Sequence, residues 1–333
     1  MRTGSVISFE NPISVLSFSA TVGKKEHEGP LKEYFPDYFE DEFCGQKTFE
    51  KAEMTLQKVT VERAIKKAGL TPSDIDIICG GDLLNQCTGS NYGLRDFNIP
   101  FVGMYGACST MALSLINSAC FLEGGLANHT ASVTSSHFCS AERQFRYPLE
   151  YGNQRTPLSQ WTVTGSGCVI LKRGCGRVKI KNALIGRITD FGITDINNMG
   201  AAMAPAAADT IKRFLVDTGT TPDDYDLILT GDLGFIGSSL LVRLLKEDGI
   251  DISNLHNDCG MMIYKRKSQD VHAGGSGCGC SASVLCAKIL PELKEGKLKN
   301  VLFCATGALM STTTIFQGES IPAIAHLVNI ASE

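Results

Sequence analysis

The chain has 333 residues, of which 43% are hydrophobic and 20% are charged, and its formal net charge at pH 7 is −4. This composition is typical of a globular protein with two domains or one large duplicated domain. Because the charge balance is acidic and no basic stripe or nucleic-acid-binding motif occurs, we expect no nucleic acid partner.

The N-terminal residues do not resemble a secretory signal, because they lack an extended apolar run and include an acid at Glu10. We therefore expect synthesis in the cytosol without export. The 13 cysteines are odd in number and contain no CxxC pair of the zinc-ribbon or thioredoxin type. They are expected to be mostly reduced core residues, and no motif predicts a metal site.

Residues 99–122 contain no charged side chain and are long enough to span a bilayer. Pro100, Gly103 and Gly106 interrupt the segment, which reads as a strand, a turn and a helix. We expect a buried central helix here instead of a membrane span.

Two segments of the chain repeat each other. Residues 71–83 read TPSDIDIICGGDL and residues 221–233 read TPDDYDLILTGDL, with eight of thirteen positions identical. Each copy follows an amphipathic helix that is predicted to end at Gly69 or Gly219, and each leads into a buried strand. Each half of the chain is therefore expected to contain a helix, a turn and a buried strand in this order.

A weaker correspondence aligns Cys108 with Cys280, at the start of a mostly apolar helix that leads to an apolar strand in both copies. The dividing point is predicted at the loop KRGCGR, close to residue 176. This gives an N-terminal half of residues 1–175 and a C-terminal half of residues 176–333.

The order and spacing of AIKKAGLTPSDIDIICGGD, YGACSTMALSLINSACFLEGG and WTVTGSGCVILKR resemble the ketoacyl synthase and thiolase superfamily. The resemblance implies an α/β fold of the thiolase-like, five-layer αβαβα type, internally duplicated. It also matches the nucleophilic cysteine of those enzymes to Cys108, and their Gly-rich strand entry to Gly165, Ser166 and Gly167.

A closer resemblance is to the stage V sporulation protein AD family, through strings such as GDLLNQ, AERQFRYP, AMAPAAADTIK and HNDCG. That family implies a spore protein that binds dipicolinic acid, a pyridine with two carboxylates. It further implies that the protein acts with SpoVA membrane proteins in dipicolinate uptake during sporulation and in its release at germination. The same resemblance implies a peripheral position on the spore inner membrane. The superfamily implies a homodimer.

Condensing enzymes need a histidine, and a second histidine or an asparagine, to handle protons and stabilise an oxyanion. The resemblance places Asp232 where one histidine is expected, and the turn around Cys278 where the other partner is expected. Cys280 could stand in for a second thiolase cysteine, but the histidine is still missing. The sequence therefore predicts a binding protein without cofactor or turnover, in which Cys108 marks a vestigial nucleophile position.

A dianionic ligand needs hydrogen-bond donors, which helix N-termini and arginines can supply. The predicted ligand-binding residues are Cys108, His137, Arg143, Asp232, Cys278 and Cys280. His137 could point into the Cys108 cavity or cap the end of a strand, and Arg143, Arg146 and Arg155 could bind ligand or belong to an ordinary loop. His256 and His272 have similar but weaker claims to the site, and His27, His129 and His326 have weaker claims still.

Apolar walls for the ligand ring could come from Phe138, Phe145, Tyr147 or Trp161. Two alternative functions stay open. One is a ketoacyl synthase or acyltransferase that uses Cys108, with His137 in place of the missing histidine. The other is a purely structural scaffold subunit with a filled central pocket.

Overall fold

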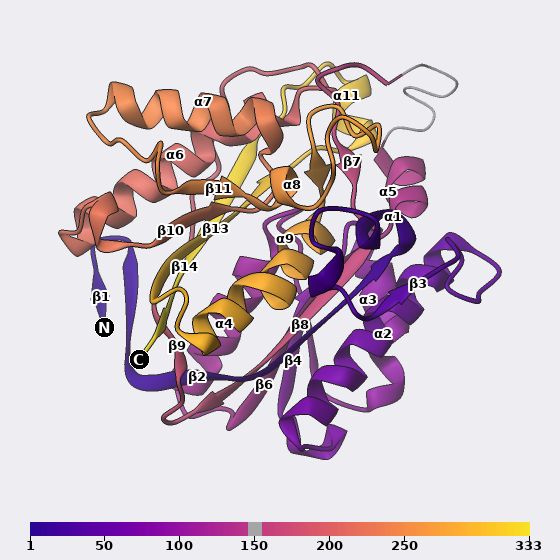
Figure 1. The fold of residues 1–333 in the computed structure, drawn as a ribbon, viewed down its shortest axis with the longest axis vertical. Coiled ribbons are helices and arrows are strands. Elements are labelled where there is room, and N and C mark those ends of the chain that lie inside the picture. Colours follow the sequence, from indigo (N-terminus) through magenta and orange to yellow (C-terminus); the bar gives the residue numbers. More distant parts are fainter. Residues whose placement is uncertain (146–154) are drawn as a thin grey trace.

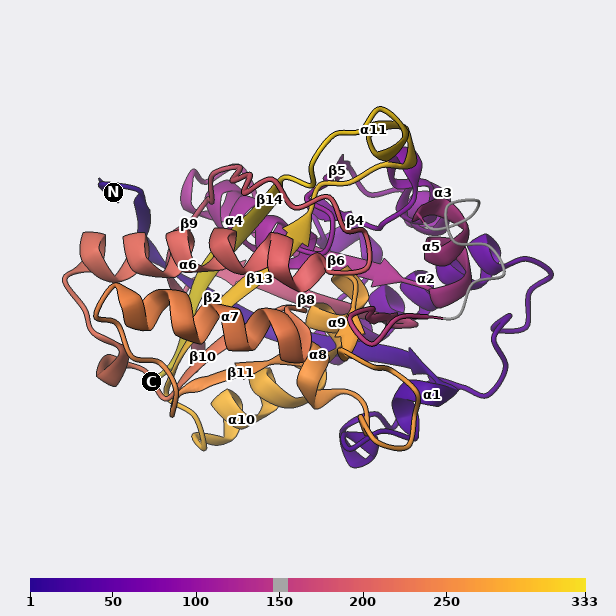
Figure 2. The same ribbon diagram turned by 90° about the horizontal axis from the view of Figure 1, so that it is seen from above.

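The computed structural model describes residues 1–145 and 155–333. Its main feature is a large mixed sheet with helices on both faces (Figures 1 and 2). In sheet order the strands are β11 (His256–Asp258), β10 (Leu227–Thr230), β13 (Asn300–Ala308), β14 (Ala323–Ser332), β9 (Val178–Leu184), β2 (Val6–Gly23), β8 (Gly165–Arg173), β6 (His129–Ser136), β4 (Ile77–Gly81) and β5 (Phe101–Gly103).

Short elements complete the sheet and the loops. Strands β1 (Arg2–Thr3) and β3 (Tyr38–Phe39) pair with β2, and β7 (Trp161–Thr162) pairs with β12 (Gly275–Ser276). The short helices are α1 (Lys24–His27), α3 (Thr88–Leu94), α5 (Phe138–Phe145), α8 (Cys259–Met262) and α11 (Thr312–Phe316).

The long helices form three layers. Helix α2 (Phe49–Ala68) packs on β2, β6 and β8, and α6 (Met199–Thr218) packs on β13 and β14 beside α7 (Gly234–Glu247). Helix α4 (Thr110–Glu123) contacts strands of both halves and lies beside α9 (Cys278–Val284), which continues through residues 285–289 into α10 (Leu290–Glu295). The arrangement is the predicted five-layer αβαβα fold (Figures 1 and 2).

The predicted duplication recurs in three dimensions. Helices α2 and α6 both end at a glycine in the left-handed conformation, Gly69 with φ 71° and Gly219 with φ 66°. After each helix, an aspartate accepts two backbone N–H groups: Asp76 from residues 128 and 129, and Asp226 from residues 299 and 300. The strand order β2-β8-β6-β4-β5 is matched by β9-β14-β13-β10-β11.

The uncharged segment 99–122 forms β5 and most of α4, as expected for a buried central helix. Along α4 the side chains of Met111, Leu115 and Ile116 are fully or almost fully buried. Among the described residues, no helix combines the length and the apolar character needed to cross a bilayer.

We predict that Gly167→Ala destabilises the protein by about 1–3 kcal/mol, because a methyl group at this position of β8 would lie 2.3 Å from the carbonyl oxygen of Ala282 in α9. Urea unfolding measures the change. Gly124→Ala is the control, since its added carbon would come no closer than 3.3 Å to a neighbouring atom. Equal losses in both variants would contradict a close approach of β8 and α9.

Candidate functional site

Cys108 lies in the turn that leads into α4. The preceding residue, Ala107, has a φ of 50°, a left-handed conformation that residues other than glycine rarely adopt and that occurs often at functional sites. The backbone N–H groups of Ser109 and Thr110 donate to the carbonyl oxygens of Gly106 and Ala107, at 3.0 and 3.3 Å. These two N–H groups at the start of the helix are therefore used within the turn.

Asp232 lies behind Cys108, at the end of β10, and is fully buried. Its Oδ2 accepts hydrogen bonds from the Ser276 hydroxyl at 3.1 Å and the Gly277 N–H at 2.8 Å, and its Oδ1 accepts one from the Thr306 hydroxyl at 2.9 Å. The Ser276 Oγ is in turn 4.0 Å from the Cys108 Sγ. One hydroxyl group therefore connects the carboxylate to the thiol.

The electrostatics of this group oppose a reactive thiolate. Burial raises the pKa of Cys108 well above its usual value, and the negative charge of Asp232 raises it further. Burial also raises the pKa of Asp232 to about 6, although its hydrogen bonds favour the charged form. Because nucleophilic cysteines have lowered pKa values, this environment does not activate Cys108.

A small cavity opens in front of Cys108, with a water-accessible volume of about 50 Å³. It is mostly apolar, and the described residues that line it include no lysine, arginine or histidine. The lining residues are Leu83, Ala107, Cys108, Ala141, Glu142, Phe145, Gln160, Thr162, Asn197, Met199, Ser276, Ala308 and Met310.

The two other predicted cysteines are buried close to this site without lining the cavity. The Cys278 thiol donates to the carbonyl oxygen of Ser135 at 3.0 Å and packs with Leu83, Cys108 and Ala141. Cys280 belongs to the main apolar core. Cys108 is therefore the one predicted cysteine that borders the cavity among the residues described.

His137 lies outside the Cys108 cavity and borders a second cavity. Its Nε2 donates to the carbonyl oxygen of Glu42 at 2.8 Å, and its Nδ1 accepts from the N–H of Cys139 at 3.2 Å. Burial lowers its pKa, so the ring is neutral. This arrangement matches the alternative in which His137 caps the end of β6, and it does not place an imidazole next to the Cys108 thiol.

Arg143 and Arg155 also lie away from the cavity lining. Arg143 has a mostly exposed side chain that forms an ion pair with Glu50. Arg155 donates to the carbonyl oxygens of Gln160 and Asp270, and its guanidinium is 4.8 Å from the centre of the Trp161 ring. Arg146 lies outside the described residues.

Of the aromatic residues predicted to form the walls of the ligand site, Phe145 lines the Cys108 cavity. Phe138 and Trp161 stack on each other, with ring centres 3.7 Å apart, and border the second cavity instead. Tyr147 lies outside the described residues. The structure therefore brings Cys108 and Phe145 together at one cavity, with Asp232 and Cys278 behind its wall.

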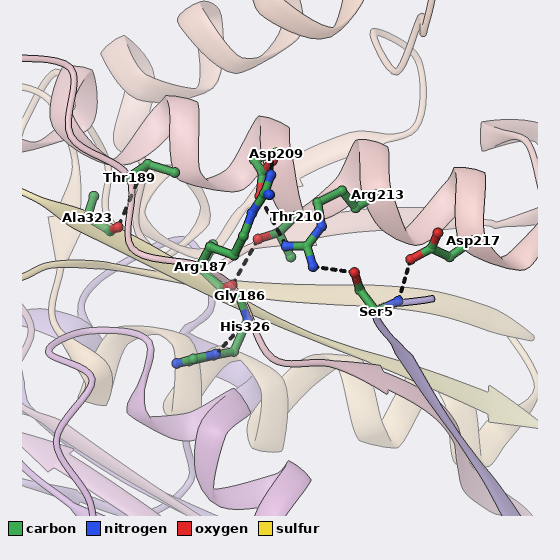
Figure 3. Close-up of polar contacts among 11 residues, drawn as sticks. Ser5, Gly186, Arg187, Thr189, Asp209, Thr210, Arg213, Asp217, Ala323 and His326 are labelled. Atoms are coloured by element: carbon green, nitrogen blue, oxygen red, sulfur yellow. Dashed lines mark hydrogen bonds and ion pairs between the residues drawn. The ribbon is translucent and has the colours of Figure 1, made fainter. Parts of the chain in front are cut away.

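Two residues near the site are absent from the predicted ligand-binding set. His326 of β14 accepts the N–H of Gly186 on Nδ1 at 3.2 Å (Figure 3), and burial lowers its pKa to about 4. Its Nε2 faces Gly106, since a carbon added to that glycine would lie 3.7 Å away. The Nε2 group of Gln160 donates to the carbonyl oxygens of Asp232 at 2.7 Å and Gly275 at 2.8 Å. These bonds connect the segment at Gln160 to the residues that follow β10 and to β12.

No sequence motif marks either residue. The C-terminal strand is buried on both faces, so the alternation of its side chains does not indicate which way His326 points. Gln160 lies in a loop and carries no periodic signal either.

Known structures share this fold. The 3-oxoacyl-[acyl-carrier-protein] synthase III from Aquifex aeolicus VF5 superposes with a TM-score of 0.60 at 13% identity, over 96% of this chain and 99% of that one. Cerulenin-bound OleA from Xanthomonas campestris gives a TM-score of 0.60 at 13% identity, over 99% of both chains.

One relative is much more similar to this chain in sequence than these structures are. Stage V sporulation protein AD from Bacillus subtilis (strain 168) is 48% identical over 318 residues, which cover 96% of this chain and 94% of that protein. The sequence model of the family described as stage V sporulation protein AD (SpoVAD) matches residues 4–331. The chain therefore belongs to the stage V sporulation protein AD family.

Proposed function

We propose that the protein binds dipicolinate in the cavity beside Cys108 and carries out no turnover, as part of dipicolinate uptake during sporulation and release at germination. For the absence of turnover, the observation that carries this proposal is the buried contact of Asp232 through Ser276 to Cys108. By the resemblance to the condensing enzymes, this carboxylate stands where those enzymes need a neutral imidazole.

A negative group at this position works against condensation chemistry. It repels an oxyanion that would form at the substrate carbonyl, and it keeps the nearby thiol protonated. His137 contacts Glu42 and Cys139, so it does not replace the missing base. These features favour the binding protein over the acyltransferase alternative.

The cavity offers a pyridine dicarboxylate both apolar walls and neutral polar groups. Phe145, Met199 and Met310 can contact the ring, while Ser276 and Thr162 carry hydroxyl groups on the lining. Asn197 also lines the cavity, and its side-chain NH2 group is of a type that donates to carboxylate oxygens.

The proposed partners are a second copy of the chain and the SpoVA membrane proteins, at the surface of the spore inner membrane. β5 lies at the edge of the sheet and pairs with β4 on one side. Val102 and Tyr105 are exposed there, at 36% and 45%. An edge strand with exposed apolar side chains suits antiparallel pairing with a second copy across a twofold axis.

We predict that millimolar dipicolinate raises the thermal unfolding midpoint, because a ligand that binds the native state stabilises it by about 2.7 kcal/mol at about 100 times Kd. Cys108→Ala and Ser276→Ala should reduce the rise. Cys139→Ser is the matched thiol control, since Cys139 lies outside the Cys108 cavity. No rise in the unmodified protein at saturating ligand would overturn the proposed function.

We predict that dipicolinate affinity increases about tenfold between pH 7.5 and pH 5, because Asp232, with a pKa of about 6, becomes neutral and stops repelling the anionic ligand. Calorimetric titration at several pH values measures the effect. The same titration with Asp232→Asn corrects for protonation of the ligand itself. If the variant kept the full pH dependence, Asp232 would not be its source.

We predict that acyl thioesters do not label Cys108 at neutral pH, because burial and Asp232 raise the pKa of the thiol. Intact-protein mass spectrometry after incubation with an acyl thioester tests this, with a functional 3-oxoacyl synthase as the positive control. A stable acyl adduct on Cys108 would instead support the acyltransferase alternative.

A further inference from the structure

Helix α5 forms one wall of the Cys108 cavity, through Ala141, Glu142 and Phe145. It packs against the first turns of α2 (Figures 1 and 2). Its first residue, Phe138, borders the second cavity instead. A single short helix therefore lies between the two cavities, and a shift of this helix would change the shape of the Cys108 cavity.

Glu53 of α2 is a buried carboxyl group at the contact with α5, and it is only 1% exposed. Its Oε1 accepts a hydrogen bond from the Ser135 hydroxyl at 3.1 Å, and its Oε2 lies 2.7 Å from the Ser140 hydroxyl. Ser135 belongs to β6 and Ser140 to α5. One side chain therefore connects α2, the end of β6 and the helix that walls the cavity.

The hydrogen-bond geometry favours a proton on Glu53. The Ser140 hydroxyl has one hydrogen but two acceptors within reach, Glu53 Oε2 at 2.7 Å and the carbonyl oxygen of His137 at 3.1 Å. A neutral Glu53 donates its O–H to Ser140, and the Ser140 hydroxyl is then free to donate to His137. Both contacts are satisfied at once, which a carboxylate cannot achieve.

The charge of Asp82 favours the same state. Asp82 is fully buried and accepts the N–H groups of Leu84 and Ser90 together with the Ser90 hydroxyl, so it carries the negative charge of the pair. Glu53 has only hydroxyl groups as partners. Burial and the charge of Asp82 raise the pKa of Glu53 to about 8.

The other ionisable groups around α2 do not reverse this preference. Cys278 faces Glu53 from α9, and burial keeps its thiol protonated. His137 is neutral and packs its ring on Phe49, with ring centres 5.6 Å apart. Arg143 is paired with Glu50 at the exposed side of the contact. The strands under α2 carry their charged side chains only at the ends remote from Ser135: Glu10, His129, Lys172 and Arg173.

We propose that Glu53 is a positioning residue of the ligand cavity, which holds α5 in its binding position as a neutral acid and releases the helix on ionisation. This proposal rests on the proposed function and names the group through which alkaline pH regulates the same cavity. An ionised Glu53 would be a second buried negative charge beside Asp82. Its path to water requires α5, which contacts it through Ser140, to move.

The chain contains its own probe of this movement. Trp161 is the single tryptophan, and its ring stacks on Phe138 of α5 with ring centres 3.7 Å apart. The first measurement is therefore Trp161 fluorescence of the ligand-free full chain, from neutral to alkaline pH. We expect a transition centred near pH 8.

Glu53→Gln should remove this transition and keep the emission of the neutral form, because an amide keeps the shape of the acid and donates to Ser140 without ionising. Glu62→Gln is the matched control, since Glu62 is an exposed position of the same helix. It should keep the transition.

Calorimetric titration with dipicolinate measures the consequence for the ligand. Binding to the unmodified protein should be about tenfold weaker one pH unit above the transition than one unit below it, because only about a tenth of the molecules then keep a neutral Glu53. Glu53→Gln should bind equally at both pH values. Glu53→Ala, which loses the contact with Ser140, should bind weakly at both. Asp232, with a pKa of about 6, and the ligand carboxyl groups are already largely ionised in this range.

Two fluorescence results would overturn the proposal. One is the absence of a transition in the unmodified protein. The other is the same transition in Glu53→Gln, which would assign it to another group, such as Lys25, whose Nζ lies 3.3 Å from the centre of the Trp161 ring.

Equal dipicolinate affinity of the unmodified protein below and above the transition would also overturn the regulation of the cavity. A transition that follows Glu53, in a protein that binds no dipicolinate at any pH, would instead contradict the proposed function and support the role of Glu53 in placing α5. The two failures are therefore distinguishable.

Discussion

The close contact between the strands of the sheet and the starts of the two central helices is the constraint on which the site depends. It is made by glycines without space for a side chain: a carbon added to Gly167 would lie 2.3 Å from the carbonyl oxygen of Ala282, and one added to Gly307 would lie 2.3 Å from that of Gly106. This packing sets the turn before α4 against the end of β13. Cys108 and Thr306, the hydroxyl partner of Asp232, are held in place by it.

The two copies of the repeated GDL motif have different roles after the duplication. Asp82 accepts the N–H groups of Leu84 and Ser90 and so organises the start of α3. Asp232 accepts hydrogen bonds from the site itself, and the corresponding role at the start of α7 is taken by Asp258, through the N–H groups of residues 233 and 234. Identical residues in one motif therefore became a structural cap in one half and a buried group behind the cavity wall in the other.

Local patterns predicted the fold well, because helix ends, turns and buried strands leave signals within a few residues. Gly69 and Gly219 end their helices as expected, and segment 99–122 contains the predicted buried helix. The cavity was harder to predict, because the direction of a side chain after a strand depends on distant partners. His137 is turned by a carbonyl group from the loop at Glu42, and His326 reaches the turn before Cys108 from the last strand.

Strand β2 belongs to both halves of the molecule. It pairs with β8 from Ile13 to Val22 and with β9 through residues 6–8 and 13–14, so one continuous strand joins the two half-sheets. A clamshell opening between the halves would break these backbone hydrogen bonds. The two half-sheets therefore cannot swing apart about a hinge, as the domains of hinge-closing binding proteins do, without the loss of this strand pairing.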